Sequence, residues 1–126
     1  MLTQYSVFLY AECVNALGME SGAISDGQMT ASSQYSSSYA ARLGRLHLKA
    51  SGGYSGGWIS RYNNQNQWLM VDMGHQNTIV TAVATQGRDA TNQWVKTYKL
   101  QHRVWSGGSY QYYREQGQSV DKVRQT

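Results

Sequence analysis

The amino-acid sequence predicts an all-β fold, an antiparallel sandwich or barrel that forms one domain. Three observations support this. The 13 Gly residues interrupt almost every window long enough for a helix, and the clearest periodic segments are rich in β-branched residues. Only 14% of the 126 residues are charged, and the sequence contains no Pro. Gly and Asn therefore mark the turns. Ser, Gln, Asn, Thr and Tyr must supply most of the polar surface, which is common in extracellular β-rich domains. Four Trp and ten Tyr provide the apolar area that disordered sequences lack.

Four segments are predicted as strands. Gln67–Met73 is a short, mostly apolar run bounded by Asn and Gly, which indicates a strand buried on both faces. Thr78–Thr85 is rich in β-branched residues and has apolar side chains on both faces. Trp94–Trp105 alternates with a period of two, and Tyr110–Arg114 returns after the turn Ser106–Ser109, so this pair is predicted as a hairpin. We expect Trp68, Trp94 and Trp105 to pack in the core beside these strands.

Long segments rich in Gly, Ser and Asn separate the predicted strands. Such loops often carry binding function. A weak helical pattern at Ser36–Leu46 contains Ser and Gly and is interpreted as part of a loop. The predicted loops are Ser32–Arg45, Ala50–Gly57, Arg61–Asn66 and Gly87–Gln93.

The net charge of +4 is consistent with ordinary solubility or with attraction to an anionic surface, such as membrane headgroups or sulfated glycans. Nucleic acid is disfavoured as a partner, because the basic residues are scattered without the spacing of a recognition motif. No run approaches the ~18 apolar residues of a membrane span. Met1–Glu12 lacks the basic start and long apolar centre of a signal peptide.

The sequence contains no pattern typical of catalysis or of a metal centre. Cys13 is the one cysteine, so any disulfide it forms is intermolecular. His47, His75 and His102 lack metal-ligand spacing, and no G-x-S-x-G nucleophile motif occurs. Asp72 lies in a predicted strand without a partner carboxylate, which favours a buried structural hydrogen bond. We therefore expect no enzymatic activity.

A series of motifs extends in order from about Cys13 to Gln118: Leu17–Asp26, Met29–Ser33, Ala41–His47, Asn66–Gly74, Thr85–Arg88 and Gln93–Leu100. This order closely resembles a discoidin domain, the C-type domain of coagulation factors V and VIII. The resemblance implies an eight-stranded jelly-roll sandwich, an extracellular location, and ligand recognition by loops, called spikes, at one end of the barrel. It implies phospholipid headgroups, galactose-type sugars, collagen or receptor proteins as ligands.

The C-terminal segment departs from the family pattern. Family members continue well beyond a segment such as Tyr113–Gly117, with closing strands and a cysteine that pairs with the one at the position of Cys13. Here Lys122–Thr126 does not follow that pattern. We therefore expect a single domain over residues 1–126 that lacks the usual closing strands and exposes a strand edge. That edge, or Cys13, is the predicted route to a homodimer.

The resemblance places the three spikes within Gln34–Arg42, Ser51–Gly57 and Arg88–Gln93, and we expect them to converge. Their tips carry Tyr among Ser and Gly instead of bare aliphatic side chains, which disfavours deep insertion into a bilayer. Tyrosine rings that stack on a sugar, with Asn, Gln and Arg as hydrogen-bonding groups, favour a cell-surface glycan. The candidate ligand-binding residues are Tyr35, Tyr39, Arg42, Tyr54, Trp58, Arg88 and Asn92.

Other interpretations of these residues stay open. In the first alternative, the tyrosines only cover the bases of the loops and Trp58 packs in the core, and none of them contacts a ligand. Anionic phospholipid could be bound through Arg42, Arg45, Arg61 and Arg88, or the chain could be a protein-interaction fragment that pairs through its exposed edge. Binding driven by charge weakens steeply with ionic strength, whereas stacking does not, so salt separates the first two functions.

One turn is similar to a calcium-binding turn in related carbohydrate-binding modules. Asp26-Gly27 with Thr30 supplies a single carboxylate, and hard cations require several oxygen ligands. A weak structural calcium site and an ordinary Asx-type turn are both compatible with this pattern. No other cofactor is expected.

We predict that less than about a tenth of the residues form helix, because Gly and β-branched residues dominate the periodic segments. A far-ultraviolet circular dichroism spectrum of the purified chain should lack a strong helical signature. A spectrum dominated by helix would contradict the predicted fold class.

Overall fold

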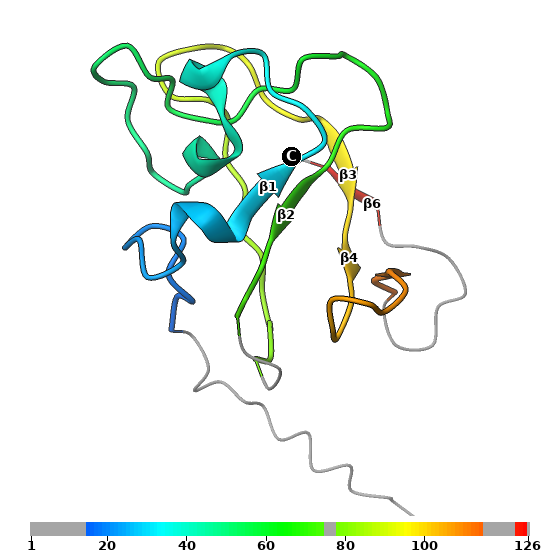
Figure 1. Ribbon diagram of the computed structural model, residues 1–126. Helices are drawn as coiled ribbons and strands as arrows, with labels where there is room; N and C mark the ends of the chain where they lie inside the picture. The colour runs from blue at the N-terminus through cyan, green and yellow to red at the C-terminus, as the bar shows by residue number, and fades with distance from the viewer. Residues whose placement is uncertain (1–14, 75–77, 115–122, 126) are drawn as a thin grey trace, which may run out of the picture.

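A computed structural model describes residues 15–74, 78–114 and 123–125 (Figure 1). These residues contain no α-helix, in agreement with the predicted fold class. Three short 3-10 helices occur: η1 (Asp26–Gln28), η2 (Ser37–Tyr39) and η3 (Ala41–Leu43). The strands in the described part are β1 (Met29–Ala31), β2 (Leu69–Val71), β3 (Thr97–Lys99), β4 (Gln101–His102), β5 (Gln111–Tyr112) and β6 (Val123–Gln125). None of the described helices has the length and apolar character needed to cross a membrane.

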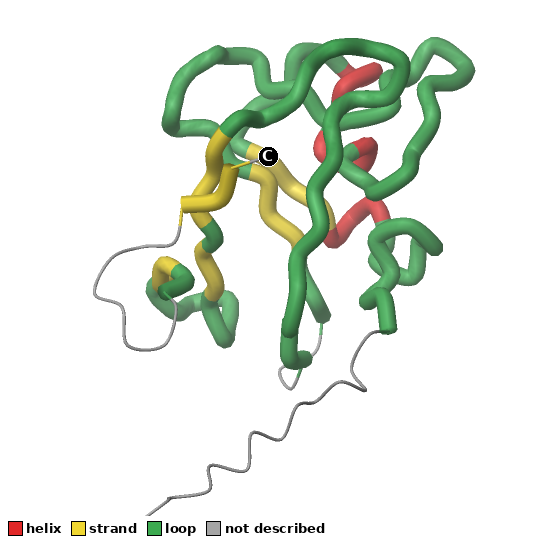
Figure 2. The backbone as a smooth tube through the Cα atoms, turned by 180° about the vertical axis from the view of Figure 1, so that it is seen from behind, coloured by secondary structure: helices red, strands yellow, loops and turns green. Residues whose placement is uncertain are grey.

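The strands pair antiparallel, as the sequence predicts, but they are short and joined by long loops (Figure 2). β1 pairs with β2, β3 with β6, and β4 with β5. The described residues thus show three separate two-stranded sheets in place of two continuous layers. The segment Ser36–Leu46, which the sequence predicts as part of a loop, is largely loop and contains the short helices η2 and η3.

The pairing of β1 with β2 is reinforced by two hydrogen bonds beyond one end of the ladder. Met29 lies opposite Val71, and Ala31 lies opposite Leu69. Beyond one end, the Asp72 N–H donates to the Gln28 carbonyl at 2.8 Å, and the Gln28 side-chain amide donates to the Asp72 carbonyl at 2.7 Å. These bonds fix the register of the two strands, and with it the face that each side chain occupies.

A small hydrophobic core lies on one face of this strand pair. Met29 is buried, Thr30 is exposed and Ala31 is half-buried, which is the alternation of a strand with one covered face. Met29 packs with Ile24 and Ala41, and Leu69, Val71 and Met73 of the neighbouring strand pack against this cluster. η3 lies against β1 and covers the core.

Gly18 brings Ile24 into this core. Its φ is +115°, and a Cβ built on it would lie 2.6 Å from the Cβ of Ala23 and 2.9 Å from the nitrogen of Ile24. Its carbonyl accepts from the N–H groups of Gly22 and Ile24 at 3.1 and 3.2 Å. The tight loop therefore requires glycine at this position.

The prediction that the strand Gln67–Met73 is buried on both faces is wrong, and so is the placement of three tryptophans in the core. Leu69 and Val71 face the core, so Trp68 lies on the opposite face by alternation and is 50% exposed. Trp94 is 51% exposed and Trp105 is 62% exposed. The core of the described residues is too small to cover a second face, and the rings remain largely in contact with solvent.

Two further expectations differ from the structure. Residues 78–85, all of which are described, adopt no regular strand, and Ile79, Val80 and Val83 are exposed. A strand that is apolar on both faces needs a packing layer on each side. In the described residues no such layer covers these side chains, and they are exposed to solvent. Asp72 is exposed instead of buried, and its Oδ1 accepts from the backbone of Gly74 at 2.9 Å.

The predicted hairpin is confirmed, although its strands are shorter than expected. Gln101 pairs with Tyr112 and His102 with Gln111. The turn closes where the Gly108 N–H donates to the Trp105 carbonyl at 2.9 Å. Cys13 and the segment Met1–Glu12 lie outside the described residues. No closing strand was expected in Lys122–Thr126, whereas β6 pairs there with β3.

Truncation of Ile24 should test the location of the core. We expect Ile24→Ala to lower the free energy of unfolding by about 2–4 kcal/mol, because Ile24 is 4% exposed and leaves a cavity. Trp68→Ala should cost less than half as much, because the residue is already half in water. Denaturant unfolding of both variants measures the difference. A larger cost for Trp68→Ala would show that the core lies on the other face.

Candidate functional site

The three loops expected to form spikes meet at one end of the molecule. The Ser55 N–H of the second loop donates to the Ser38 carbonyl of the first at 2.9 Å. The Asp89 N–H of the third loop lies 3.4 Å from the Gly56 carbonyl of the second. The predicted convergence of these loops is therefore confirmed, and we call this region the loop cluster.

Residue 59 ties the first loop to the chain that follows the second. The Tyr35 N–H donates to the Ile59 carbonyl at 2.9 Å, and the Ile59 N–H donates to the Tyr39 carbonyl at 3.2 Å. Between these bonds, the Ser36 hydroxyl accepts from the Ser38 N–H at 3.3 Å and caps η2. The positions of the Tyr35 and Tyr39 backbones are thus set by hydrogen bonds at both ends of a short turn.

The second and third loops approach so closely that glycine is required at their contact. A Cβ built on Gly56 would lie 2.3 Å from the Cβ of Asp89 and 2.7 Å from the Leu48 carbonyl oxygen. Any side chain at this position would push the loops apart.

Asp89 joins the third loop to the start of the second. Its Oδ2 accepts from the Ala50 N–H at 3.0 Å, and its Oδ1 lies 3.0 Å from the Lys49 ammonium. The Ala50 N–H, and after it the Lys49 side chain, lower the pKa of the Asp89 carboxyl below its usual range. The carboxylate is therefore charged at neutral pH and anchors the two loops to each other.

A shallow hollow of about 190 Å³ opens within the loop cluster. It is smaller than the pockets that hold drug-sized ligands, about 300 Å³ and above, and its size suits a single small ring or headgroup. Predicted site residues Tyr35, Tyr39 and Arg88 line it. Ile59 and Gln93 line it too, and they were not selected from the sequence.

The aromatic and basic groups of the hollow lie against one another. The rings of Tyr35 and Tyr39 lie edge to face, with centroids 5.6 Å apart and planes at 88°. The Arg88 guanidinium carbon lies 5.2 Å from the centre of the Tyr39 ring, and its Nη1 donates to Gln93 Oε1 at 2.8 Å. Arg88 Nε is buried and has no hydrogen-bond partner among the described residues. The hollow thus combines two tyrosine rings with the guanidinium group of Arg88.

The other predicted residues occupy different places. The Arg42 guanidinium carbon lies 4.8 Å from the centre of the Tyr54 ring, and neither residue lines the hollow. Trp58 is half-buried and its Nε1 donates to the Ser33 carbonyl at 2.9 Å, so it supports the loop base. Asn92 is exposed at the turn of the third loop and does not line the hollow.

The arginines proposed for phospholipid binding are not equally available. Arg45 donates to Asp26 Oδ1 at 2.7 Å and to the Met19 carbonyl at 2.9 Å, and its side chain is 12% exposed. Arg61 lies over the Tyr62 ring at 5.9 Å. Arg42 and Arg88 are thus the two of this set that belong to the loop cluster.

At the candidate calcium turn of Asp26 and Thr30, the Asp26 carboxylate is already paired with another side chain. Arg45 binds the carboxylate that would serve as a ligand, and Thr30 is exposed on β1. Within residues 15–74, 78–114 and 123–125, no group of three or more His, Cys, Asp or Glu is placed to hold a metal ion.

A cluster of loops over antiparallel strands, with a small aromatic hollow, defines a recognition module. Comparison with known families agrees: residues 28–126 match the F5/8 type C domain. The chain therefore belongs to the F5/8 type C, or discoidin, family, whose domains are non-catalytic binding modules with a jelly-roll β-sandwich.

The curated relatives that this chain matches are longer proteins. The sequence is 37% identical over 116 residues to coagulation factor V of Pseudonaja textilis, which covers 88% of this chain and 8% of that protein. It is 41% identical over 101 residues to human neuropilin-1, covering 77% and 10%, respectively. For mouse retinoschisin the identity is 34% over 105 residues, covering 79% and 45%. The chain thus spans less than half the length of each of these relatives.

Acid should loosen the contact made by Asp89. Because its pKa is lowered in the folded chain, the carboxylate stabilises the fold above the unfolded pKa of about 3.9, and this contribution is lost as the pH falls through the folded pKa. We expect Asp89→Asn to lower the melting temperature at neutral pH, with a gap from wild type that narrows below pH ~4. Thermal melts across pH measure it.

The matched control for this experiment is Asp72→Asn, because Asp72 is an exposed aspartate in a different turn. A gap between Asp89→Asn and wild type that is independent of pH would contradict the charged role of Asp89.

Proposed function

We propose that this chain is a non-catalytic extracellular recognition module that binds a polar ligand, most simply a cell-surface glycan, in the loop cluster. The observation that carries the proposal is the hollow in which the Tyr35–Tyr39 pair meets the Arg88 guanidinium. Membership of the discoidin family supports a binding role, and the extracellular location that we propose is supported by the similarity to secreted and extracellular-domain relatives.

The hollow suits a sugar because it offers both kinds of contact that a sugar needs. The apolar face of a pyranose ring packs on aromatic rings, and Tyr35 presents such a ring with 67% of its surface exposed. Hydroxyl groups require directional partners, and Gln93 and Arg88 provide them at the wall of the hollow.

Docking on anionic phospholipid through the loop arginines is the less favoured function. Arg45 is engaged by Asp26, which leaves Arg42 and Arg88 as the cationic groups of the loop cluster. The tips of these loops carry tyrosine hydroxyls and serines, which gain little from entering hydrocarbon. A third possibility, pairing with another chain through a strand edge, would produce self-association without a ligand.

Replacing Tyr35 should test the glycan site. We expect Tyr35→Ala to weaken binding to a saccharide selected on a glycan array about tenfold, from lost ring contact. The melting temperature should stay nearly unchanged, because the side chain is largely in solvent. Isothermal titration at two salt concentrations measures the affinity and shows whether charge contributes.

The matched control is Tyr62→Ala, because Tyr62 is 56% exposed and lies beside an arginine, as Tyr39 does, but outside the loop cluster. Equal weakening by both variants, or intact affinity with a lower melting temperature in Tyr35→Ala, would contradict the site. A chain that binds no saccharide and sediments as a dimer would favour the interaction fragment.

A further inference from the structure

The nitrogen-bearing side chains of the hollow offer hydrogen-bond donors to a ligand. Arg88 Nη1 donates to Gln93 Oε1 at 2.8 Å. Because a guanidinium group contains no acceptor, the oxygen of the Gln93 amide must face Arg88, and this leaves the amide nitrogen for other partners. Within the part of the chain that the structure describes, neither Gln93 Nε2 nor Arg88 Nη2 has a hydrogen-bond partner. Both groups can therefore donate to a ligand at the wall of the hollow.

The third loop holds Arg88 and Gln93 beside each other. The Arg88 N–H donates to the Gln93 carbonyl at 2.9 Å, and the Thr91 hydroxyl donates to the Arg88 carbonyl at 3.3 Å. Ala90, within the same turn, has a φ of +55°. The pair is thus joined through its backbone as well as through its side chains, and the turn sets the positions of both donor groups.

No carboxylate of the described residues neutralises Arg88. The acidic residues that the structure describes all lie away from the lining of the hollow: Glu20, Asp26, Asp72 and Asp89. Asp89 follows Arg88 in the chain, but its carboxylate binds the Ala50 N–H and the Lys49 ammonium. The Arg88 guanidinium instead lies over the Tyr39 ring. An anionic group in the hollow would therefore meet a cation that has no counter-ion among the described residues.

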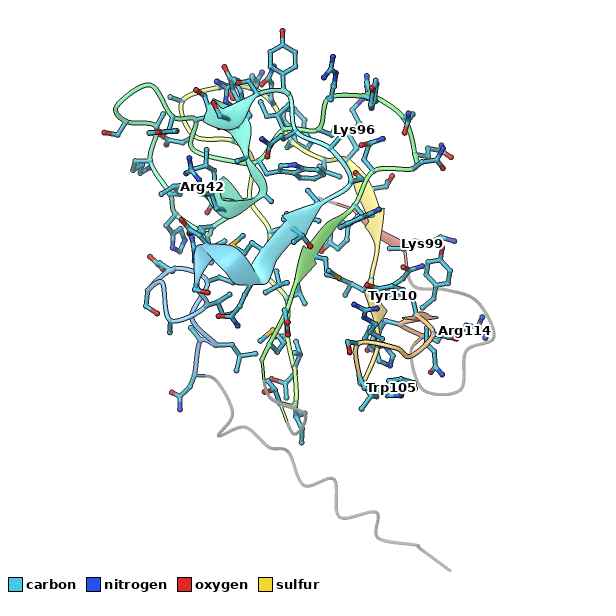
Figure 3. All side chains as sticks on the ribbon, in the orientation of Figure 1. Arg42, Lys96, Lys99, Trp105, Tyr110 and Arg114 are labelled. Carbon is cyan, nitrogen blue, oxygen red and sulfur yellow. The ribbon has the colours of Figure 1, made fainter. Side chains whose placement is uncertain are left out.

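Other cations of the molecule lie outside the hollow. Figure 3 shows Arg42 among the loops, and Lys99 and Arg114 beside the β4–β5 hairpin. The Arg42 guanidinium lies over the Tyr54 ring and does not line the hollow. Arg88 is thus the one cation among the described residues that line it. The charge of the site comes from a single guanidinium group, which suits a ligand with one anionic group.

We propose that the hollow binds a sugar that carries a carboxylate, either a uronic acid or a sialic acid, and that this carboxylate accepts hydrogen bonds from Arg88 and Gln93. The inference rests on the proposed glycan function and names the class of sugar. The apolar face of the sugar ring would pack on Tyr35, which is 67% exposed. The carboxylate would then reach the opposite kind of contact, a charge-assisted hydrogen bond with the guanidinium group.

A carboxylate fits these donors better than the alternatives do. A neutral sugar hydroxyl leaves the Arg88 charge without a counter-ion, whereas a carboxylate accepts from the N–H groups and also neutralises that charge. A sulfate ester has three terminal oxygens, whereas the two donor groups, Arg88 Nη2 and Gln93 Nε2, match the two oxygens of a carboxylate. The small volume of the hollow, about 190 Å³, favours one sugar ring over a long polyanion.

Calorimetric titration of the whole chain with matched sugars tests the proposal. The probes are the methyl glycosides of galacturonic acid and of a sialic acid, the methyl ester of each, neutral methyl galactoside, and its 6-sulfate. We expect at least one acid to bind about tenfold or more tightly than its own ester and than the neutral galactoside, because the ester lacks the charge that strengthens the hydrogen bonds. The two acids show which source of carboxylate the hollow prefers.

Two substitutions assign this preference to the hollow. Gln93→Glu keeps an oxygen that accepts from Arg88 but replaces the amide donor with a negative charge, so it should weaken binding of the acid about tenfold or more and reverse the preference. Arg88→Gln should make the acid and its ester bind alike. Arg61→Gln is the matched control and should retain the preference, because Arg61 also lies over a tyrosine ring, that of Tyr62, but does not line the hollow.

The proposal is overturned if wild type binds each acid no more tightly than its ester, if the 6-sulfate binds as tightly as the acids, or if Arg61→Gln lowers the preference as much as Arg88→Gln. A neutral sugar whose binding is weakened by Tyr35→Ala would leave the glycan function intact in the first of these outcomes. If no saccharide binds, the glycan function and this inference both fail. The comparison of acid with ester needs no variant, so it decides the question even if a substituted chain does not fold.

Discussion

The antiparallel register of β1 and β2 is the constraint on which the rest of the structure depends. Gln28 secures it, because its backbone carbonyl and its side-chain amide both bond the backbone of Asp72. This register turns Met29 and Val71 to one face, where the core forms, and Trp68 to the other. Because the side-chain period is two, a slip of one residue would exchange these faces and disperse the core.

The same strand pair positions the loop cluster. Past the end of the ladder, Ser33 Oγ donates to Gln67 and accepts from the Arg61 N–H, while the Ser33 carbonyl accepts from Trp58. These bonds connect the start of the first loop to the chain between the second and third loops. The hollow is thus built on loops whose ends are fixed by hydrogen bonds. Such preorganisation would limit the entropy lost if a ligand binds there as proposed.

The two ends of the molecule differ in chemistry although both are aromatic and basic. At the loop cluster, Tyr39 and Arg88 enclose a small hollow with Gln93 at its wall. At the hairpin, Val104 and Trp105 are 72% and 62% exposed. The same residue types therefore line a hollow at one end and stand in solvent at the other, because the backbone presents them differently.

The sequence by itself determined the fold class, the family, the hairpin and the three loops, because Gly spacing, β-branched runs and motif order are local properties of the chain. It selected Tyr35, Tyr39 and Arg88 correctly as neighbours. Only the tertiary structure decided that Ile24 and Met29, and not Trp68 or Trp94, form the core. Only the structure shows that Ile59 and Gln93 also line the hollow. It also shows that Arg45 is paired with Asp26 and is therefore not an available cation. Those outcomes depend on which segments lie opposite one another in the folded chain. The residue pattern of a single strand or loop does not predict which of its faces a distant segment will cover.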